Sequence, residues 1–308
     1  AWDDLPLRIP GEDASGVRSG IDFLRRAAEG TVKAVKADVV VIGGGNTAID
    51  AARTALRLGA ASVTIAYRRT KAEMPAQPEE IAEAEEEGIR LVFLAAPLEV
   101  LTDGNNGTRR ARALRLQRMT LGPFDESGRR RPVPAEGDEF ELPCRLVLRA
   151  LGQRPALPAE APAAQKNGRL VADRWTLATD HDGVFAGGDV VLGPATVVEA
   201  IGQGRRAAEA IERYLNPQSA THFPWRVPRA LDTKFDPEAP ASRDKRVHAP
   251  KADPHKRAHD LAEVERTIAA GPARREARRC LRCDYGKACP EPAGAPKTTT
   301  SRQERRAP

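Results

Sequence analysis

The stretch Ala37-Asp-Val-Val-Val-Ile-Gly-Gly-Gly-Asn-Thr-Ala-Ile-Asp50 predicts how the first half of the chain folds. The apolar run from Val39 to Ile42 is typical of a buried parallel strand, and a glycine-rich turn follows it. Apolar residues then recur at helical spacing until Gly59, and the segment from Ser62 to Tyr67 predicts a second strand. Strand, turn, helix and strand form a βαβ unit, so we expect an α/β fold with a parallel sheet.

The turn has the spacing G-x-G-x-x-A of a dinucleotide-binding motif. In such a motif the first glycine makes the turn, the second lets the backbone approach a pyrophosphate, and the small third residue lets helix and strand pack closely. The phosphates lie at the helix N-terminus, where unpaired N–H groups and the helix dipole favour negative charge. We therefore predict that six consecutive residues bind the dinucleotide: Gly43, Gly44, Gly45, Asn46, Thr47 and Ala48.

The end of the second strand predicts which dinucleotide is bound. An NAD site places Asp or Glu there to bind the ribose 2′-hydroxyl, whereas this chain has Tyr67, Arg68 and Arg69. Two guanidinium groups offer forked donors that match a 2′-phosphate, so the sequence favours NADP over NAD. The alternative is that both arginines are solvated surface residues.

The composition limits the classes of function. The chain has 308 residues, 30% charged and 4% aromatic, which suits about two α/β domains with cores of Ala, Val, Leu and Ile. Residues 217–308 carry much of the formal charge of +6, but no aromatic-interleaved basic motif accompanies it. We therefore expect no nucleic-acid partner, and an RNA-binding tail is the weakest alternative. Because no apolar run reaches about eighteen residues and no signal peptide is seen, we expect a cytoplasmic protein without a membrane span.

Further elements are expected along the chain. Helices are predicted over 17–28, 78–87, 196–215, 256–269 and 272–280, and strands over 90–94, 98–101, 111–121, 144–151, 170–172 and 183–186. Polar composition predicts a loop over 122–138. Residues 217–308 are rich in Pro, Arg, Lys and His, so outside the two short helices we expect an extended or disordered tail.

Five pieces of the sequence carry a resemblance to a known family. They are Ile9-Pro-Gly-Glu-Asp13, Val41-Ile-Gly-Gly-Gly-Asn-Thr-Ala-Ile-Asp50, Tyr67-Arg-Arg69 with Glu73-Met-Pro-Ala76, Ala150-Leu-Gly-Gln153, and Gly183-Val-Phe-Ala-Gly-Gly-Asp189 with its following helix. Together they resemble the flavin-dependent pyridine-nucleotide oxidoreductases related to the small subunit of glutamate synthase. The resemblance implies a Rossmann-like NADP-binding domain (38–151) inserted into a two-part FAD-binding domain (1–37 and 152–216), with a basic tail over 217–308.

The same resemblance implies roles for individual residues. Gly43 to Thr47 would hold the NADP pyrophosphate, and Arg68 and Arg69 its 2′-phosphate. The residues implied for FAD are Gly188 and Asp189, on the ribityl or phosphate side, and Ala195, Thr196 and Val197 at a helix start that faces the flavin. That helix N-terminus would stabilise negative charge on the flavin, and hydride transfer needs no general base, so no catalytic side chain is predicted. Gly152 and Gln153 would lie near the junction of the two cofactors, or would only form a strand-to-loop turn.

Two features depart from the family pattern. Residues 1–37 have no room for the glycine motif that would bind the ADP half of FAD. We therefore expect an N-terminally truncated sequence, the alternative being a second polypeptide that supplies the missing half. Cys144 stands alone before a predicted strand, where we expect a small buried apolar residue. It cannot form a dithiol, which argues against the disulfide chemistry of thioredoxin reductases.

A cysteine cluster lies near the C-terminus. Cys280, Cys283 and Cys289 look like the family's cysteine motif that precedes an iron–sulfur cluster. Three thiolates fall short of the four that a [4Fe-4S] cluster usually needs, so a partner chain or a water would supply the fourth ligand. Zinc with His255 or His259 as a further ligand and unligated thiols are the alternatives.

The leading hypothesis is an NADPH-dependent flavoprotein oxidoreductase that passes electrons through an iron–sulfur centre to a partner subunit or iron–sulfur protein. Its basis is the ordered pair of nucleotide signals together with the cysteine cluster. The rival hypothesis is a non-catalytic, truncated or NADP-binding subunit of a larger complex, because the chain lacks the first glycine motif of an FAD domain.

Overall fold

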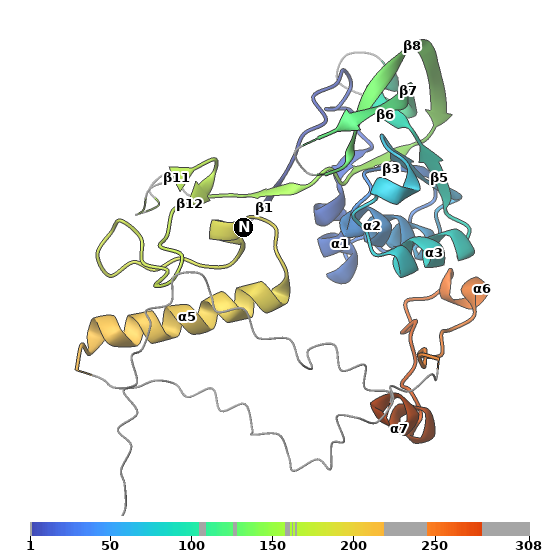
Figure 1. The fold of residues 1–308 in the computed structure, drawn as a ribbon. Coiled ribbons are helices and arrows are strands. Elements are labelled where there is room, and N and C mark those ends of the chain that lie inside the picture. Colours follow the sequence, from blue (N-terminus) through green and yellow to red (C-terminus); the bar gives the residue numbers. More distant parts are fainter. Residues whose placement is uncertain are drawn as a thin grey trace, which may run out of the picture. The chain divides into compact units, whose positions relative to one another are not determined.

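The computed structural model describes residues 2–104, 109–125, 128–157, 161, 163, 165–218 and 245–278 (Figure 1). The chain divides into two compact units, Ala1–Arg229 with Lys251–Val264 and Ala230–Pro250 with Glu265–Pro308. Within these ranges, every strand lies in the first unit, which also contains the glycine-rich motif. In the described ranges, no helix combines the length and the apolar character that a membrane crossing requires.

A five-stranded parallel sheet organises the first unit. Its strand order is β2-β9-β3-β4-β5, and the strands are β2 Val17–Ser19, β9 Leu146–Arg149, β3 Asp38–Ile42, β4 Ser62–Tyr67 and β5 Arg90–Phe93. The glycine motif follows the central strand β3, whose apolar run is buried on both faces of the sheet. The predicted βαβ unit is therefore present, with α2 (Asn46–Arg57) between β3 and β4.

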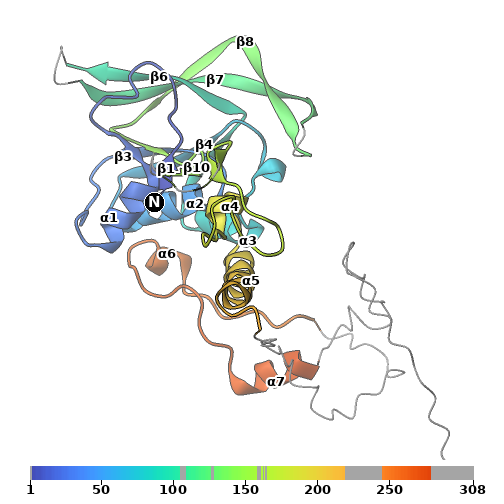
Figure 2. The same cartoon turned by 90° about the vertical axis from the view of Figure 1, so that its left-hand side faces the viewer.

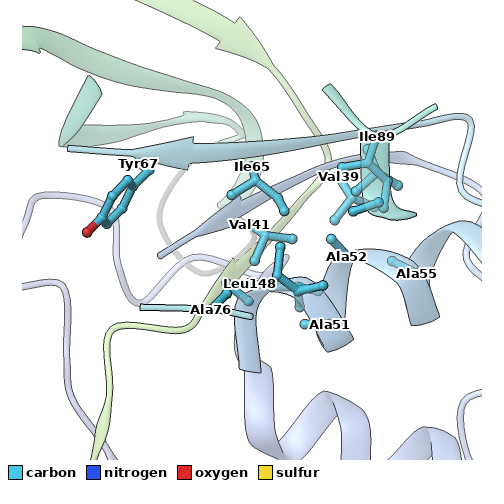
Figure 3. Packing of buried hydrophobic residues seen from close by; sticks show 14 of the residues in the cluster. Val39, Val41, Ala51, Ala52, Ala55, Ile65, Tyr67, Ala76, Ile89 and Leu148 are labelled. Carbon is cyan, nitrogen blue, oxygen red and sulfur yellow. The ribbon is translucent and has the colours of Figure 1, made fainter. Parts of the chain in front are cut away.

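Helices cover one face of the parallel sheet, and Figure 2 shows a second sheet on its other face. The helical side holds α1 (Gly20–Ala28), α2 and α3 (Pro78–Glu86). Side chains of β3, β4 and β9 pack there against small alanines of α2, as Figure 3 shows for Val41, Ile65 and Ala52. On the other side, Val40 packs in a separate core with Leu114 and other residues of the second sheet. Because both faces are covered, the strands read as continuous apolar runs.

The second sheet is antiparallel and has the order β6-β7-β8. Its strands are β6 Ala95–Asp103, β7 Arg110–Phe124 and β8 Arg130–Pro143. The prediction of a loop over 122–138 is therefore wrong, since β8 runs through most of that segment. Its Pro132 and Pro134 hide the strand signal, but β8 is an edge strand, where proline is tolerated because no outer ladder needs its N–H.

The start of the chain also differs from the prediction. Val17 lies in β2 and the helix begins at Gly20, because the Ser19 side chain caps it by accepting a hydrogen bond from Asp22 N (3.3 Å). β2 pairs with β9, so residues 17–19 lie in the same sheet as the strand of the glycine motif. A further short strand, β1 (Trp2–Asp4), pairs with β10 (Gln153–Pro155).

The described residues between 152 and 218 form short elements and one long helix. The strands β11 (Gln165–Lys166) and β12 (Arg169–Leu170) form a small hairpin, and the predicted strand at 183–186 is only a single bridge between Ala178 and Phe185. The short α4 (Asp189–Leu192) precedes α5 (Val197–Leu215). The helix predicted over 196–215 is confirmed, with Thr196 as its N-cap and a capping box to Glu199.

The segment Lys251–Val264 folds back onto α2 and α3. Arg257 is 2% exposed, and its guanidinium pairs with Glu86 (2.6 Å) and Glu87 (2.9 Å). Arg57 Nε donates to the carbonyl of Arg257 (2.7 Å), and Lys251 pairs with Glu83. We call this stretch the docking segment. It contains the short α6 (Pro254–Arg257), which ends far earlier than the predicted helix over 256–269.

The helix predicted over 256–269 is wrong for a local reason. Asp253 caps the first turn, with Pro254 at its start, and after Arg257 the chain turns back so that Ala252 N donates to Val264 O (2.8 Å). In the second unit, α7 (Ala270–Arg278) agrees with the predicted helix at 272–280 as far as the structure describes it.

Candidate nucleotide-binding site

A cavity of about 450 Å³ opens at the carboxyl edge of the parallel sheet. It lies where the strand ends of β3, β4 and β9 meet, which is the place where open α/β sheets bind ligands. Its walls include most of the predicted nucleotide-binding residues: Gly43, Gly44, Gly45, Thr47, Arg68, Arg69 and Gly152. Sequence reasoning did not single out Arg129, which also lines it.

The first two glycines are required by close approaches within the protein. Gly43 has φ +146°, and a Cβ there would lie 2.2 Å from the carbonyl oxygen of Ala150. A Cβ on Gly44 would lie 2.6 Å from the ring of Tyr67. These two glycines therefore let the turn pass between β9 and the end of β4.

Gly45 is different because the fold does not need a glycine at this position. Its φ is −92°, and a Cβ would meet only Pro75, at 3.9 Å. Gly45 is also the N-cap of α2 and offers no side-chain acceptor to the first N–H groups of that helix. The open space beside these donors is what a pyrophosphate approaching a helix N-terminus requires.

A loop after β4 supports the glycine turn. Ala76 N donates to the carbonyl of Gly44 (3.2 Å), and Asn46 accepts a hydrogen bond from Gln77 N (3.1 Å). The Tyr67 hydroxyl donates to the carbonyl of Glu73 (2.7 Å), which fixes the ring against Gly44. The segment Glu73-Met-Pro-Ala76 thus forms a wall of the site and contributes Pro75 to the cavity lining.

The two arginines after β4 have different surroundings, although both line the cavity. Arg68 is exposed. Arg69 is only 5% exposed; its Nε donates to the carbonyl of Arg130 (2.7 Å) and its Nη2 to the carboxylate of Asp125 (2.6 Å). Both partners of Arg69 lie at the turn between β7 and β8.

A second, smaller cavity of about 140 Å³ lies beside the first. Gly152, with φ +123°, lines both cavities, and Gln153, Thr47 and Pro194 line the second. Gln153 belongs to β10 and pairs with Asp4 of β1. The alternative of a plain strand-to-loop turn therefore does not describe Gly152 and Gln153 completely, because both also line a cavity.

The wall of the second cavity is fixed by an ion-pair group. Arg149 on β9 pairs with Glu12 (2.6 Å) and Asp4 (3.0 Å). Burial alone would raise the pKa of Glu12, but backbone N–H groups of Arg8 and Leu7 and the Arg149 guanidinium lower that pKa overall. The Ile9-Pro-Gly-Glu-Asp13 segment is thereby held against the sheet.

The residues predicted to bind FAD lie together before α5. Asp189 begins α4 and accepts a hydrogen bond from Ala195 N (3.2 Å), which places Asp189 next to Thr196 and Val197 at the start of α5. Gly188 has φ +72°, and its N–H donates to the side chain of Gln203. Pro194, which precedes this helix start, lines the second cavity together with Thr47.

The predictions for the four cysteines have two different outcomes. Cys280, Cys283 and Cys289 lie outside the described residues, and no group of potential metal ligands forms within the described part of the chain, which includes His255 and His259. Cys144 is 2% exposed, and burial, with a smaller contribution from the Asp38 carboxylate, raises its pKa to about 12. It is therefore a buried apolar residue, as predicted.

Residues 1–204 match the pyridine nucleotide-disulphide oxidoreductase family, and the chain belongs to that family. This confirms, at the level of the family, the prediction of a nucleotide- and FAD-dependent oxidoreductase. The family uses FAD and NADP(H), and Gly45 with its neighbouring helix N-terminus and Arg68 fit the phosphates of a dinucleotide.

Two relatives define the similarity further. The chain is 41% identical to the NADP(+)-dependent formate dehydrogenase subunit beta of Moorella thermoacetica, over 90% of this chain and 40% of that protein. It is 38% identical to the glutamate synthase [NADPH] small chain of Azospirillum brasilense, over 68% of this chain and 46% of that protein. The chain thus spans less than half the length of these relatives, and the predicted resemblance is confirmed.

Solved structures agree on the fold. Lactococcus lactis thioredoxin reductase matches with a TM-score of 0.53 at 22% identity, covering 70% of this chain and 64% of that one. Mycobacterium tuberculosis FprA in complex with NADPH matches with a TM-score of 0.54 at 21% identity, covering 70% and 62%. The expected two-dinucleotide fold class is therefore confirmed.

Proposed function

We propose that this chain binds NADPH in the 450 Å³ cavity and orients its nicotinamide toward a flavin held by the segment before α5. The observation that carries the proposal is the open space at Gly45, beside the N-terminus of α2 and within the same cavity as the exposed Arg68. A dinucleotide supplies a pyrophosphate for the first feature, and NADP(H) supplies a 2′-phosphate for the second.

The flavin part of the proposal rests on where Asp189, the start of α5 and the second cavity lie. FAD, when bound, would accept a hydride from NADPH and pass electrons onward. Asp189 and the start of α5 would bind and orient FAD, and Gly152 and Gln153 would line the junction, since their cavity lies beside the nucleotide cavity. The domain division belongs to the same proposal: 38–151 would form the main part of an NADP-binding domain, and 152–216 part of an FAD-binding domain.

Onward transfer is proposed from the relatives and the tail. Two of the relatives are named as a beta subunit and a small chain, which supports a partner subunit as electron acceptor. Cys280, Cys283 and Cys289 would then hold an iron–sulfur cluster, with zinc as the alternative. A cytoplasmic location belongs to the same proposal and rests on the sequence alone.

The test uses Gly45→Ala in the 308-residue chain, with NADPH binding followed by fluorescence. A methyl group at Gly45 meets only Pro75, so the fold should keep its thermal midpoint, while the pyrophosphate loses its approach and NADPH binding weakens about tenfold or more. The matched control is Gly202→Ala on α5, where an added Cβ has nothing within 4 Å. Gly30→Ala would not serve, because Gly30 has φ +71°, which strains any other residue. Absence of NADPH binding by the unsubstituted chain would overturn the proposal.

Flavin binding and hydride transfer are tested separately, by flavin absorbance. FAD is added anaerobically, followed by NADPH, and the flavin absorbance is recorded. Bleaching by NADPH, and more slowly by NADH, would support hydride transfer. Tight NADPH binding without any flavin binding would favour the rival function, an NADP-binding subunit without catalysis of its own.

A further inference from the structure

A third cavity, of about 520 Å³, lies at the amino edge of the parallel sheet. Its walls include Gly16 just before β2, Val35 before β3 and Leu146 at the beginning of β9. Parallel strands begin at one edge of a sheet and end at the other, so this amino-edge cavity is remote from the nucleotide cavity. The two cavities share no lining residue.

The polar lining of the amino-edge cavity is positively charged. Among the described residues that line it, three are arginines, Arg18 of β2, Arg110 of β7 and Arg145 just before β9, and none is Asp or Glu. Arg145 is already engaged, because its Nη1 donates to the carboxylate of Asp103 (2.6 Å). Arg18 and Arg110 are exposed, and neither side chain forms an ion pair or hydrogen bond within the described ranges. Two cations therefore lack a carboxylate partner in that part of the chain.

Backbone hydrogen bonds fix the strands that carry these arginines. Ala111 N donates to Ser15 O (2.9 Å), and Val147 N donates to Gly16 O (2.7 Å). The lead into β2 is thereby held between the beginnings of β7 and β9. The three arginines are far apart in the sequence, and this pairing brings them to one cavity.

The rest of the lining is mostly apolar. Phe23 and Val35 are buried in the core on the helical side of the sheet, and Val32 and Leu146 pack against that core. The volume lies within the range of small-molecule sites, roughly 300–1,000 Å³. Cations beside apolar surface suit an anion that also carries an apolar body, because such a ligand pairs with the charges and covers the apolar wall.

We propose that the amino-edge cavity binds a small organic anion, whose carboxylate or phosphate group contacts Arg18 and Arg110 and whose apolar body packs on Phe23 and Val32. Guanidinium groups match both kinds of head group, because their planar fork donates two parallel hydrogen bonds. The chain would thus have a second ligand site that is independent of the proposed binding of NADPH.

The test titrates the 308-residue chain with 2-naphthoate, 1-naphthyl phosphate and inorganic phosphate by isothermal titration calorimetry. At least one naphthyl compound should bind with a Kd of about 1 mM or tighter, and about tenfold more tightly than inorganic phosphate, which has no apolar body. The tighter of the two identifies the head group. Binding of neither naphthyl compound, or equally tight binding of inorganic phosphate, would overturn the inference.

Variants locate the bound naphthyl compound. Arg18→Gln and Arg110→Gln should each weaken its binding about tenfold, because each removes a charged hydrogen bond. Arg112→Gln is the matched control: Arg112 is an exposed arginine of the same strand as Arg110 but does not line the cavity. It should change the Kd less than about twofold, because an exposed charge outside the site is screened by salt. Equal losses in Arg110→Gln and Arg112→Gln would contradict the site.

Arg68→Gln separates this site from the nucleotide cavity, which Arg68 lines. If Arg68→Gln weakens the naphthyl compound and Arg18→Gln does not, the anion binds in the nucleotide cavity and the inference fails. If Arg18→Gln weakens it but the unsubstituted chain binds no NADPH, only the proposed function fails.

Discussion

The helices α2 and α5 both follow a glycine-rich turn, yet they are buried to very different extents. The apolar face of α2 is covered by β3, β4 and β9, and Ala48, Ile49 and Ala52 have no exposed surface. On α5, Val197, Val198 and Ile201 are 75%, 78% and 68% exposed. Helical periodicity predicts an apolar face, but it does not tell what covers that face.

The two helices belong to differently packed parts of the same unit. The nucleotide side is a packed three-layer core, whereas α5 finds little cover among the described residues and buries only Gln203 and Ala210. The difference predicts that stability resides on the nucleotide side, and the predictions below test it.

The largest contrast is expected between two isoleucines. Ile65 in β4 lies in the core shown in Figure 3, so Ile65→Ala should lower the free energy of unfolding by about 2–5 kcal/mol. The same truncation at exposed Ile201 should change it by less than about 0.5 kcal/mol. Denaturant unfolding followed by circular dichroism measures both. Equal losses of unfolding free energy in the two variants would contradict the difference in burial between β4 and α5.

A somewhat smaller effect is expected at the docking segment. Arg257→Met keeps the bulk of the side chain but leaves the buried Glu87 with fewer cations, which should cost about 3 kcal/mol. Lys256→Met, at the exposed neighbouring residue, is the control and should change little. If Arg257→Met unfolds like the unsubstituted chain, the docking segment does not stabilise the nucleotide side.

The smallest effect is expected for Cys144, whose thiol should scarcely react at neutral pH in the folded chain. With its pKa raised to about 12, roughly one thiol in ten thousand is ionised at pH 8. N-ethylmaleimide should therefore label Cys144 only in denaturant, as peptide mass spectrometry would show. Rapid labelling in the folded chain would contradict the packing of β9 against the second sheet.

The same pKa gives a pH dependence with a definite sign. The ordinary thiol value is 9.0, so above that pH the unfolded chain loses this proton before the folded chain does. The contribution of Cys144 to stability is therefore complete below pH 9 and is lost as the pH rises toward 12, by at most about 1.4 kcal/mol per pH unit.

The parts of the fold that depend on local signals were predictable. The strand, glycine turn and helix at 39–58 follow from periodicity and spacing, and the structure has them as β3 and α2. The hairpin β7–β8 was only half predicted, because the prolines and charges of β8 obscure its alternation and an edge strand needs no strong pattern.

The roles of the arginines could not be read from the sequence. Arg68 and Arg69 look alike as neighbours, and only the contact of Arg69 with the β7–β8 turn distinguishes them. Arg129 likewise has no local signal, since its place at the cavity depends on pairing of β8 with β7. In the same way, the burial of Arg257 depends on carboxylates of α3 that are distant in sequence.

The most direct test of the account is amide hydrogen exchange of the 308-residue chain with and without NADPH. We predict slow exchange in β3, β4 and α2, further slowed by NADPH at residues 43–50, and fast exchange along α5 in both states. Protection of α5 equal to that of α2, or NADPH protection that avoids residues 43–50, would contradict the account.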